Sequence, residues 1–235
     1  MAAGRNRRSR LRTLAAAALV LLPALNAGAA DSVCYGTPSN GRLEGGVQIP
    51  RSGPNFAPYS SVGVGLGRTY VHSKVKDVIA AAYASLAASN PDKTFVYGES
   101  GWAKGGRIRP HRTHQNGLAV DFMVPVIDAD GRSVPLPTGP LNRFGYAIEF
   151  DASARHEDLT IDFEAIAAHL IALHEASERN GIGISRVIFD RDFLPKLYAT
   201  PRGSFVKQSI PFMKGEPWIR HDEHYHVDFA VPCRP

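Results

Sequence analysis

A histidine-rich segment near the C-terminus, 220–229, constrains the fold of this chain more than any other feature. It holds three of the nine histidines of the protein within six residues. The run 226–231, which overlaps its end, contains β-branched and aromatic residues and alternates with period two, which predicts a β-strand. If that strand begins near His224, the side chains of His224 and His226 project from one face, because side chains alternate along a strand. Two such imidazoles form half of a transition-metal site; the alternatives are a histidine-rich loop and a polar strand edge.

A second segment, 111–124, places histidines next to an acid inside an apolar run. Residues 118–126 predict a core strand that is interrupted by Asp121. An acid in such a run is costly unless it is paired or bound to a metal. Asn116-Gly117 permits a sharp turn, so the chain can fold back and bring His114 beside Asp121. The alternative is that Asp121 caps a loop and His114 is a surface residue.

Together the two segments supply the donor atoms of a catalytic zinc site. Such a site takes three protein ligands and leaves a fourth position for water. His114, Asp121 and His226 offer two imidazoles and one carboxylate, a set suited to zinc. Zinc held there would lower the pKa of a bound water from ~15.7 toward ~7 and polarise a carbonyl. The sequence therefore predicts one catalytic zinc ion.

Several neighbouring residues are candidates for the chemistry around this metal. His224, next to the predicted ligand on the same strand face, is placed to take the proton of the water. His221 and His111 are candidates to stabilise an oxyanion or to assist a leaving amine. Asp222 shares the alternation parity of His224 and is a rival base if the strand starts early, whereas Glu223 is expected to face away.

The first 30 residues are expected to be a secretory signal peptide. A head with five arginines precedes a short apolar run, 14–25, and a small-residue exit at 27–30. The alternative, a permanent anchor, is disfavoured because the run is too short to span a bilayer. The protein has 27 basic and 22 acidic residues, and removal of these five arginines leaves 22 of each. The basic isoelectric point therefore belongs to the export signal and gives no argument for nucleic-acid binding.

Residues 31–235 are expected to form one domain, since they suffice for one sizeable core and contain no run long enough for a membrane span. The only cysteines, Cys34 and Cys233, lie near its two ends, and in an exported protein this favours a disulfide bond between them. Apolar residues at helical spacing predict two main helices, at about 73–89 and 162–179. Residues 35–70 predict loops with short strands, and 144–150 an extended element.

The two metal-site motifs, in this order, resemble a known group of enzymes. The segment from His114 to Asp121 matches the H-x6-D motif of the lysostaphin, D-alanyl-D-alanine metallopeptidase and hedgehog group, and His224-Tyr225-His226 matches its H-x-H motif. Within that group the chain most resembles the penicillin-insensitive murein endopeptidases. Three further features carry this resemblance: the segment 34–43, His111 three residues before His114, and His221 three before His224.

The resemblance implies a small α+β fold whose central antiparallel sheet holds one zinc ion. It assigns His114, Asp121 and His226 as ligands and His224 as catalytic base. The implied activity is hydrolysis of D-alanyl peptide cross-links of peptidoglycan, D-Ala–meso-diaminopimelate, in the periplasm. No serine nucleophile takes part, which accounts for penicillin insensitivity.

Some alternatives remain open at this point. A D-alanyl-D-alanine carboxypeptidase or dipeptidase would share the fold and the chemistry, and a non-catalytic zinc-binding cell-wall protein would share only the site. The resemblance also implies a possible second metal, to which His111 would correspond, but no acidic partners align for it in 127–160. Asp228 stands where close relatives are expected to have a basic residue.

Overall fold

The computed structural model describes Met1 and residues 31–235, so the expected signal peptide lies outside the described residues. A five-stranded sheet in the order β12-β13-β7-β6-β4 forms its centre. All neighbouring strands are antiparallel except β4 and β6, which are parallel. The α+β fold class is therefore confirmed, with one parallel pair in a mainly antiparallel sheet. The strands are β4 (Phe56–Pro58), β6 (Phe95–Tyr97), β7 (Ala119–Met123), β12 (Gly183–Ile188) and β13 (His224–Ala230).

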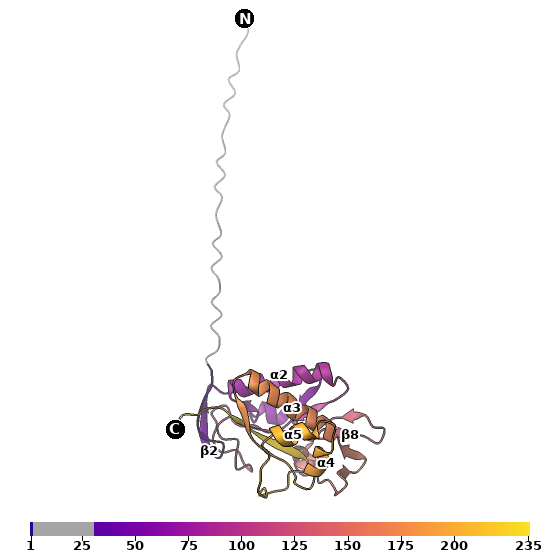
Figure 1. Ribbon diagram of the computed structural model, residues 1–235. Helices are drawn as coiled ribbons and strands as arrows, with labels where there is room; N and C mark the ends of the chain where they lie inside the picture. The colour runs from indigo at the N-terminus through magenta and orange to yellow at the C-terminus, as the bar shows by residue number, and fades with distance from the viewer. Residues whose placement is uncertain (2–30) are drawn as a thin grey trace.

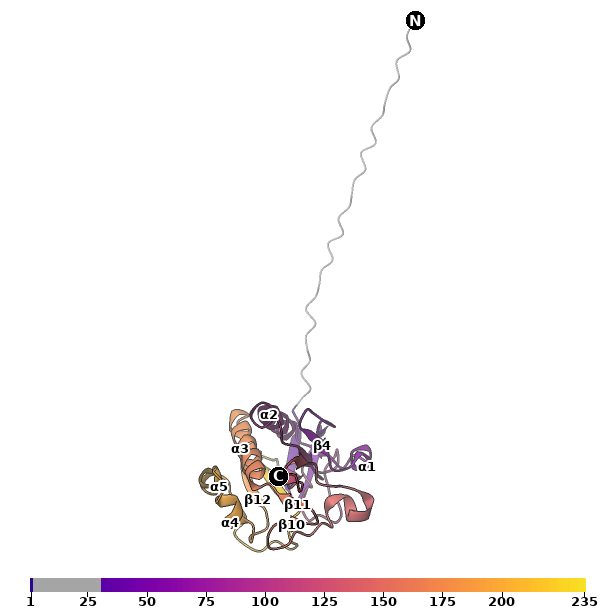
Figure 2. The same cartoon turned by 90° about the vertical axis from the view of Figure 1, so that its right-hand side faces the viewer.

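Two 17-residue helices, α2 (Ser73–Ser89) and α3 (Phe163–Arg179), lie side by side along this sheet (Figures 1 and 2). Both match the predicted helices closely. The α3 side chain His169 shows which face they cover: its ring contacts Tyr83 of α2, Phe122 of β7 and Tyr225 of β13. Since strand side chains alternate, the odd-numbered residues of β13 pack under the helices. Its even-numbered residues, and Asp121 of β7, face the other way.

Small sheets and short helices surround this centre. A hairpin at the start of the described domain pairs β1 with β2, β3 pairs with β5, and a four-stranded sheet has the order β10-β11-β8-β9. These elements are β1 (Val33–Thr37), β2 (Asn40–Glu44), β3 (Val47–Gln48), β5 (Tyr70–Val71), β8 (Val126–Ile127), β9 (Ser133–Val134), β10 (Arg155–His156), β11 (Leu159–Ile161), α1 (Ser61–Gly65), α4 (Leu194–Tyr198), α5 (Gly203–Ser209) and the 3-10 helix η1 (Pro140–Gly145).

The prediction of an extended element at 144–150 is wrong. The segment begins inside η1, which ends at Gly145, and Arg143 and Phe144 have positive φ angles of 52° and 60°. The physical reason is the side chain of Asn142, whose oxygen accepts hydrogen bonds from the backbone N–H groups of Gly139 and Gly145, both at 2.9 Å. Asparagine side chains that bond nearby backbone in this way favour turns over strands.

The two ends of the described domain are joined, as the sequence predicts. A disulfide bond links Cys34 to Cys233, and backbone hydrogen bonds of 2.9 Å run from Gly36 to Arg234 and from Arg234 to Cys34. Most of the buried apolar side chains of the described residues belong to a cluster that spans both main helices and the central sheet. Within the described part of the chain, every helix is too short or too polar to cross a membrane. The assignment of 31–235 as a single domain stays a prediction.

Candidate metal centre

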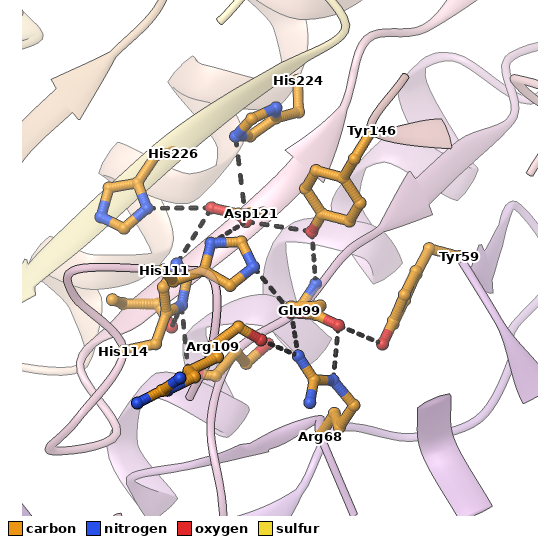
Figure 3. Close-up of polar contacts among 12 residues, drawn as sticks. Tyr59, Arg68, Glu99, Arg109, His111, His114, Asp121, Tyr146, His224 and His226 are labelled. Carbon is orange, nitrogen blue, oxygen red and sulfur yellow. Dashed lines mark hydrogen bonds and ion pairs between the residues drawn. The ribbon is translucent and has the colours of Figure 1, made fainter. Parts of the chain in front are cut away.

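The centre is built on the face of β7 and β13 that points away from the helices. The two strands pair so that His226 lies directly opposite Asp121. Figure 3 shows His224 and His226 pointing from β13 toward the carboxylate of Asp121. All three side chains are buried, and that of Asp121 is fully enclosed. Strand pairing therefore brings together two of the three predicted ligands.

His114 reaches the same carboxylate from the turn that precedes β7. The turn depends on Gly117, which has a φ of 77° and leaves no room for a Cβ beside the backbone nitrogen of His72. His114 itself has a φ of 69°, an unusual conformation for a residue that is not glycine. Its Nδ1 donates to the carbonyls of Ser100 and Ala119, at 3.1 and 3.2 Å. Its Nε2 is thereby left without a proton and faces Asp121.

The donor atoms of these three residues fit a zinc ion. Oδ1 of Asp121 lies 3.3 Å from Nε2 of His114 and 2.9 Å from Nδ1 of His226. Ligand atoms of a tetrahedral zinc lie roughly 3.3 Å apart, given bonds of about 2.0–2.1 Å. In addition, Nε2 of His114 is buried and has no hydrogen-bond partner among the described residues. A buried nitrogen of this kind is costly unless something binds it, and a metal ion would do so.

His226 is oriented by a second carboxylate on its own strand. Its Nε2 donates to Oδ1 of Asp228 at 2.9 Å, and Arg186 holds the other oxygen of Asp228 through its Nε at 2.8 Å. Burial would lower the pKa of His226, but Asp228 and Asp121 outweigh it and raise the pKa to about 9. A metal ligand must give up its proton at the coordinating atom. The proton on Nε2 can stay on the Asp228 side, which leaves Nδ1 for the metal.

The pKa shifts of the other two candidate ligands favour the protonation states that bind a metal ion. Burial lowers the pKa of His114 in spite of Asp121, so its ring is neutral. Burial would raise the pKa of Asp121, but the surrounding histidines, His114 first, hold it well below the usual range. Asp121 is therefore a carboxylate, the form that binds metal ions.

Glu223 does not face away, which corrects the expectation from alternation. The strand begins at His224, so residue 223 lies outside the pleat and period two does not apply to it. Its Oε1 accepts a hydrogen bond from Nδ1 of His224 at 2.8 Å, which places the free Nε2 of His224 3.8 Å from Oδ2 of Asp121. Burial lowers the pKa of His224, but the charges of Glu223 and Asp121 leave it above the ordinary value.

Asp222, the rival base, points elsewhere. Its Oδ2 accepts a hydrogen bond of 2.6 Å from the backbone of Phe150 and lies 3.1 Å from Nη1 of Arg220. Burial raises the pKa of Asp222 to about 6. It is absent from the cavity wall, whereas Glu223 and His224 are part of it.

His221 lies beside His224, with the two ring centres 4.7 Å apart. Its Nδ1 donates to the carbonyl of Ile219 at 2.9 Å, and burial lowers its pKa to about 3. A neutral His221 with its proton on Nδ1 can accept a hydrogen bond through Nε2. It has no N–H left to offer an oxyanion or a leaving amine.

His111 completes a second possible ligand group. Donor atoms of His111, His114 and Asp121 lie within 4.8 Å of one another and could hold a metal ion. However, Nε2 of His111 lies 2.6 Å from Oε2 of Glu99, and its Nδ1 is 3.7 Å from Oδ2 of Asp121. His226 is nearer to Asp121 and faces the same oxygen as His114, so it fits the third ligand position better.

A polar network that no sequence pattern indicated lies next to His111, with Glu99 at its centre (Figure 3). Arg68 contacts both oxygens of Glu99, at 2.5 and 2.7 Å, and the hydroxyl of Tyr59 donates at 2.9 Å. Burial would raise the pKa of Glu99, but His111 and Arg68 lower it to about 2. Glu99 lies two residues after the end of β6, and its carbonyl accepts a hydrogen bond from the backbone N–H of Asp121 at 3.0 Å.

Tyr146, which no sequence pattern indicated either, connects this network to the metal centre. Its hydroxyl donates to Oδ2 of Asp121 at 3.0 Å and accepts from the backbone N–H of Glu99 at 2.9 Å. Burial raises the pKa of Tyr146 well above its usual value, so it remains a donor. Gly98 permits this arrangement, because a Cβ there would lie 2.7 Å from the Tyr146 hydroxyl.

These side chains line an open cavity of about 500 Å³. Its wall includes the candidate ligands, His111, His224 and Glu223, together with Trp218, Ile219, Arg112 and Arg143. The cavity gives a substrate access to the buried metal-binding group.

Fold and site together define an α+β protein with a His-His-Asp group able to hold a metal ion at a cavity. Residues 34–135 match the family of penicillin-insensitive murein endopeptidases, so the resemblance to that family is confirmed. The matched segment includes His111, His114 and Asp121 and ends before β13. No curated protein matches the chain significantly. The family match supports a murein endopeptidase, hence a peptidase that acts on peptidoglycan outside the cytoplasm.

Proposed function

We propose that this protein is a zinc-dependent murein endopeptidase that hydrolyses the D-Ala–meso-diaminopimelate cross-links of peptidoglycan. The observation that carries the proposal is the convergence of His114, Asp121 and His226 on one point at a cavity. Two of the three ligands lie in the segment that matches the endopeptidase family. The proposal includes export to the periplasm by the N-terminal segment and a single catalytic domain over residues 31–235.

Zinc is the metal that these donors favour. Two imidazoles and a carboxylate with an open fourth position are typical of catalytic zinc sites. When bound, zinc would lower the pKa of a water and polarise the scissile carbonyl, acting as a Lewis acid. His114 would coordinate through Nε2 and His226 through Nδ1, since these nitrogens face Asp121.

His224 acts as the general base. Nδ1 is held by Glu223, so Nε2 is the basic nitrogen and faces the metal-binding group. It accepts a proton from the attacking water as the water adds to the carbonyl, and it returns the proton to the leaving amine. A carboxylate that fixes the tautomer of a histidine in this way also stabilises the charged ring that forms. Glu223 is thus a positioning residue.

The two flanking histidines take different roles in this mechanism. His221, neutral and with its proton on Nδ1, can accept a hydrogen bond from the substrate but is not a proton donor. His111 is held between Glu99 and Asp121 and contributes to positioning of the Asp121 carboxylate. We assign no second metal to His111, because Glu99, which contacts it most closely among the described residues, is already bound by Arg68.

The test is incubation of the mature protein with cross-linked muropeptide dimers, with and without a chelator, followed by mass analysis. Conversion of dimers to monomers that stops on chelation and returns with zinc is the expected result. Loss of only a terminal D-alanine from intact dimers would instead indicate a carboxypeptidase. Zinc binding with no product would indicate a non-catalytic cell-wall protein.

A further inference from the structure

The wall of the cavity contains two arginines that lack a carboxylate partner among the described residues. Each of its three carboxylates is engaged: Glu99 by Arg68 and His111, Asp121 by histidines, and Glu223 by His224. The two arginines of the wall, Arg112 and Arg143, form no ion pair with any described residue. A cavity lined in this way attracts an anionic group of its ligand.

Of these two arginines, Arg143 is the one with its guanidinium uncommitted. The guanidinium of Arg112 lies 5.5 Å from the ring centre of Trp218 and is held there by a cation–π contact. Arg143 has no such contact within the described part of the chain, and its side chain is exposed at the cavity.

The backbone that carries Arg143 is strained and locked. Arg143 and Phe144 both have positive φ angles, a conformation that is costly for residues other than glycine. Asn142 holds this conformation: its oxygen binds the N–H groups of Gly139 and Gly145, and its amide donates to the carbonyl of Pro137 at 2.6 Å. Strain of this kind persists where the surroundings enforce it and is concentrated at functional sites.

The same loop is fastened to the metal centre on its C-terminal side. The ring of Phe144 packs edge-on against Tyr59, with centres 6.2 Å apart, and Tyr146 binds Asp121. Both contacts lead back to the Glu99 network. Arg143 is therefore presented to the cavity by a short, rigid loop, which gives it a defined position relative to the metal-binding group.

We propose that Arg143 binds a free carboxylate of the cross-link peptide. The enzyme would then prefer peptides in which this carboxylate is free over peptides in which it is amidated. This inference rests on the proposed function. In a D-Ala–diaminopimelate link, a carboxyl group of diaminopimelate stands next to the scissile nitrogen, and the stem also carries a carboxyl group on its D-glutamate. A guanidinium binds a carboxylate through two parallel hydrogen bonds, and an amide cannot accept both.

The experiment compares kcat/KM for three synthetic dimers: one fully free, one amidated on diaminopimelate, and one amidated on glutamate. The wild type should prefer the free dimer by about 10- to 100-fold over one of the amidated dimers, as expected for a hydrogen bond to a charged group. Which dimer is disfavoured identifies the carboxylate. Arg143→Gln should lower the rate on the free dimer by that factor and leave the disfavoured dimer unchanged, while Arg143→Lys should retain part of the preference.

Arg132→Gln is the matched control, because Arg132 is exposed and paired with Asp130 away from the cavity wall. Each variant is checked for zinc content and thermal unfolding. Equal losses on all dimers in Arg143→Gln, or no preference in the wild type, would overturn the inference. The inference would also be overturned if Arg112→Gln, and not Arg143→Gln, lost the preference for the free dimer, because Arg112 would then be the residue that binds the carboxylate.

A binding measurement separates this inference from the proposed function. Titration calorimetry with an uncross-linked stem peptide that ends in diaminopimelate needs no catalysis. Weaker binding of about 10-fold or more in Arg143→Gln supports the role of Arg143 even if the wild type cleaves no dimer, in which case the endopeptidase proposal alone fails. Equal binding by wild type and variant overturns the role of Arg143.

Discussion

The candidate metal centre has a strand-borne half and a loop-borne half, and they are held in different ways. Asp121, His226 and Asp228 sit on β7 and β13, where the register of two paired strands determines which side chains meet. His111, His114 and Tyr146 sit on loops, where hydrogen bonds to Glu99, Ser100 and Asp121 determine their positions. The strand-borne half is fixed by the backbone, and the loop-borne half by side-chain contacts and positive-φ residues.

This difference predicts how each half responds to substitution. A change on a strand removes one functional group and leaves the ladder in place, so its effect should be large on chemistry and small on structure. A change in the loop network removes a contact that positions several side chains at once, so its effect should be moderate and spread over binding, rate and stability.

Asp121→Asn should have the largest effect, because Asp121 contacts ligands from both halves. We expect zinc affinity to fall by at least about 100-fold and hydrolysis by on the order of 10³-fold, since a metal supplies several kcal/mol of catalysis. Metal content after dialysis measures the first and dimer cleavage the second. Asp130→Asn, at an exposed position, is the control. Full zinc content in Asp121→Asn would remove Asp121 from the ligand set.

His224→Ala should keep the zinc and lower hydrolysis by about 10²- to 10⁴-fold, the usual contribution of a general base. Glu223→Gln should show a smaller loss of the same kind, because the base remains but its tautomer is no longer fixed. Zinc content and turnover are measured on the same samples. If the alanine variant loses its metal, His224 is a ligand instead of the base.

Asp228→Asn tests the support of His226 within the strand-borne half. Supporting carboxylates of this kind contribute about 10- to 100-fold to metal affinity, so a competition titration with a chromophoric chelator should report a loss in that range. Arg186→Gln, which removes only the partner of Asp228, should cost less. An unchanged affinity in Asp228→Asn would mean that strand register alone orients His226.

Tyr146→Phe tests the loop-borne half. It removes the hydroxyl that binds both Asp121 and the backbone of Glu99. We expect zinc to be retained, hydrolysis to fall by up to about 10-fold and unfolding free energy by about 1.5–3 kcal/mol, the value of a hydrogen bond to a charged group. Tyr35→Phe, at the distant hairpin, is the control. A loss confined to kcat, with stability unchanged, would point to a catalytic role for the hydroxyl.

Asp222→Asn should have the smallest effect on activity, within about 2-fold, because Asp222 lies outside the cavity wall. Its effect should be on the pH dependence of stability. A raised carboxyl pKa means that the folded state binds the proton more tightly than the unfolded state, so stability falls as pH rises from about 4 through about 6. The variant should lack this fall and gain about 1–2 kcal/mol relative to the wild type at pH 8. Denaturant unfolding of both proteins at about pH 4 and at pH 8 measures this difference in stability. If the variant instead lost hydrolysis while it kept its zinc, Asp222 would be the base.

Much of the strand-borne half could be predicted from the sequence. Asp121 stands inside an apolar run, and His224 and His226 stand two residues apart on a strand, so alternation alone puts the histidines on one face. Alternation failed at Glu223 because the strand begins one residue later, and the carboxylate there turns to His224. Asp222 is directed to Phe150 for the same reason.

The loop-borne half was mostly beyond sequence analysis. The position of His114 beside Asp121 could be predicted, because Asn116-Gly117 indicates a turn between them. Glu99, Arg68 and Tyr146 come from three separate segments, and no local pattern links them. The segment 144–150 was misassigned because its aromatic residues suggest a strand, while the side chain of Asn142 imposes a turn.

The sequence by itself determined the two main helices, the predicted ligand set and the pairing of the cysteines, because periodicity, motif spacing and residue chemistry are local properties. Only the tertiary structure decided which nitrogen of each histidine faces the centre, that Glu223 holds the proposed base, and that Arg143 stands uncompensated at the cavity. These features depend on hydrogen bonds and charges between residues that are far apart in the chain. Such contacts form only when the strands pair and the loops pack against the strands.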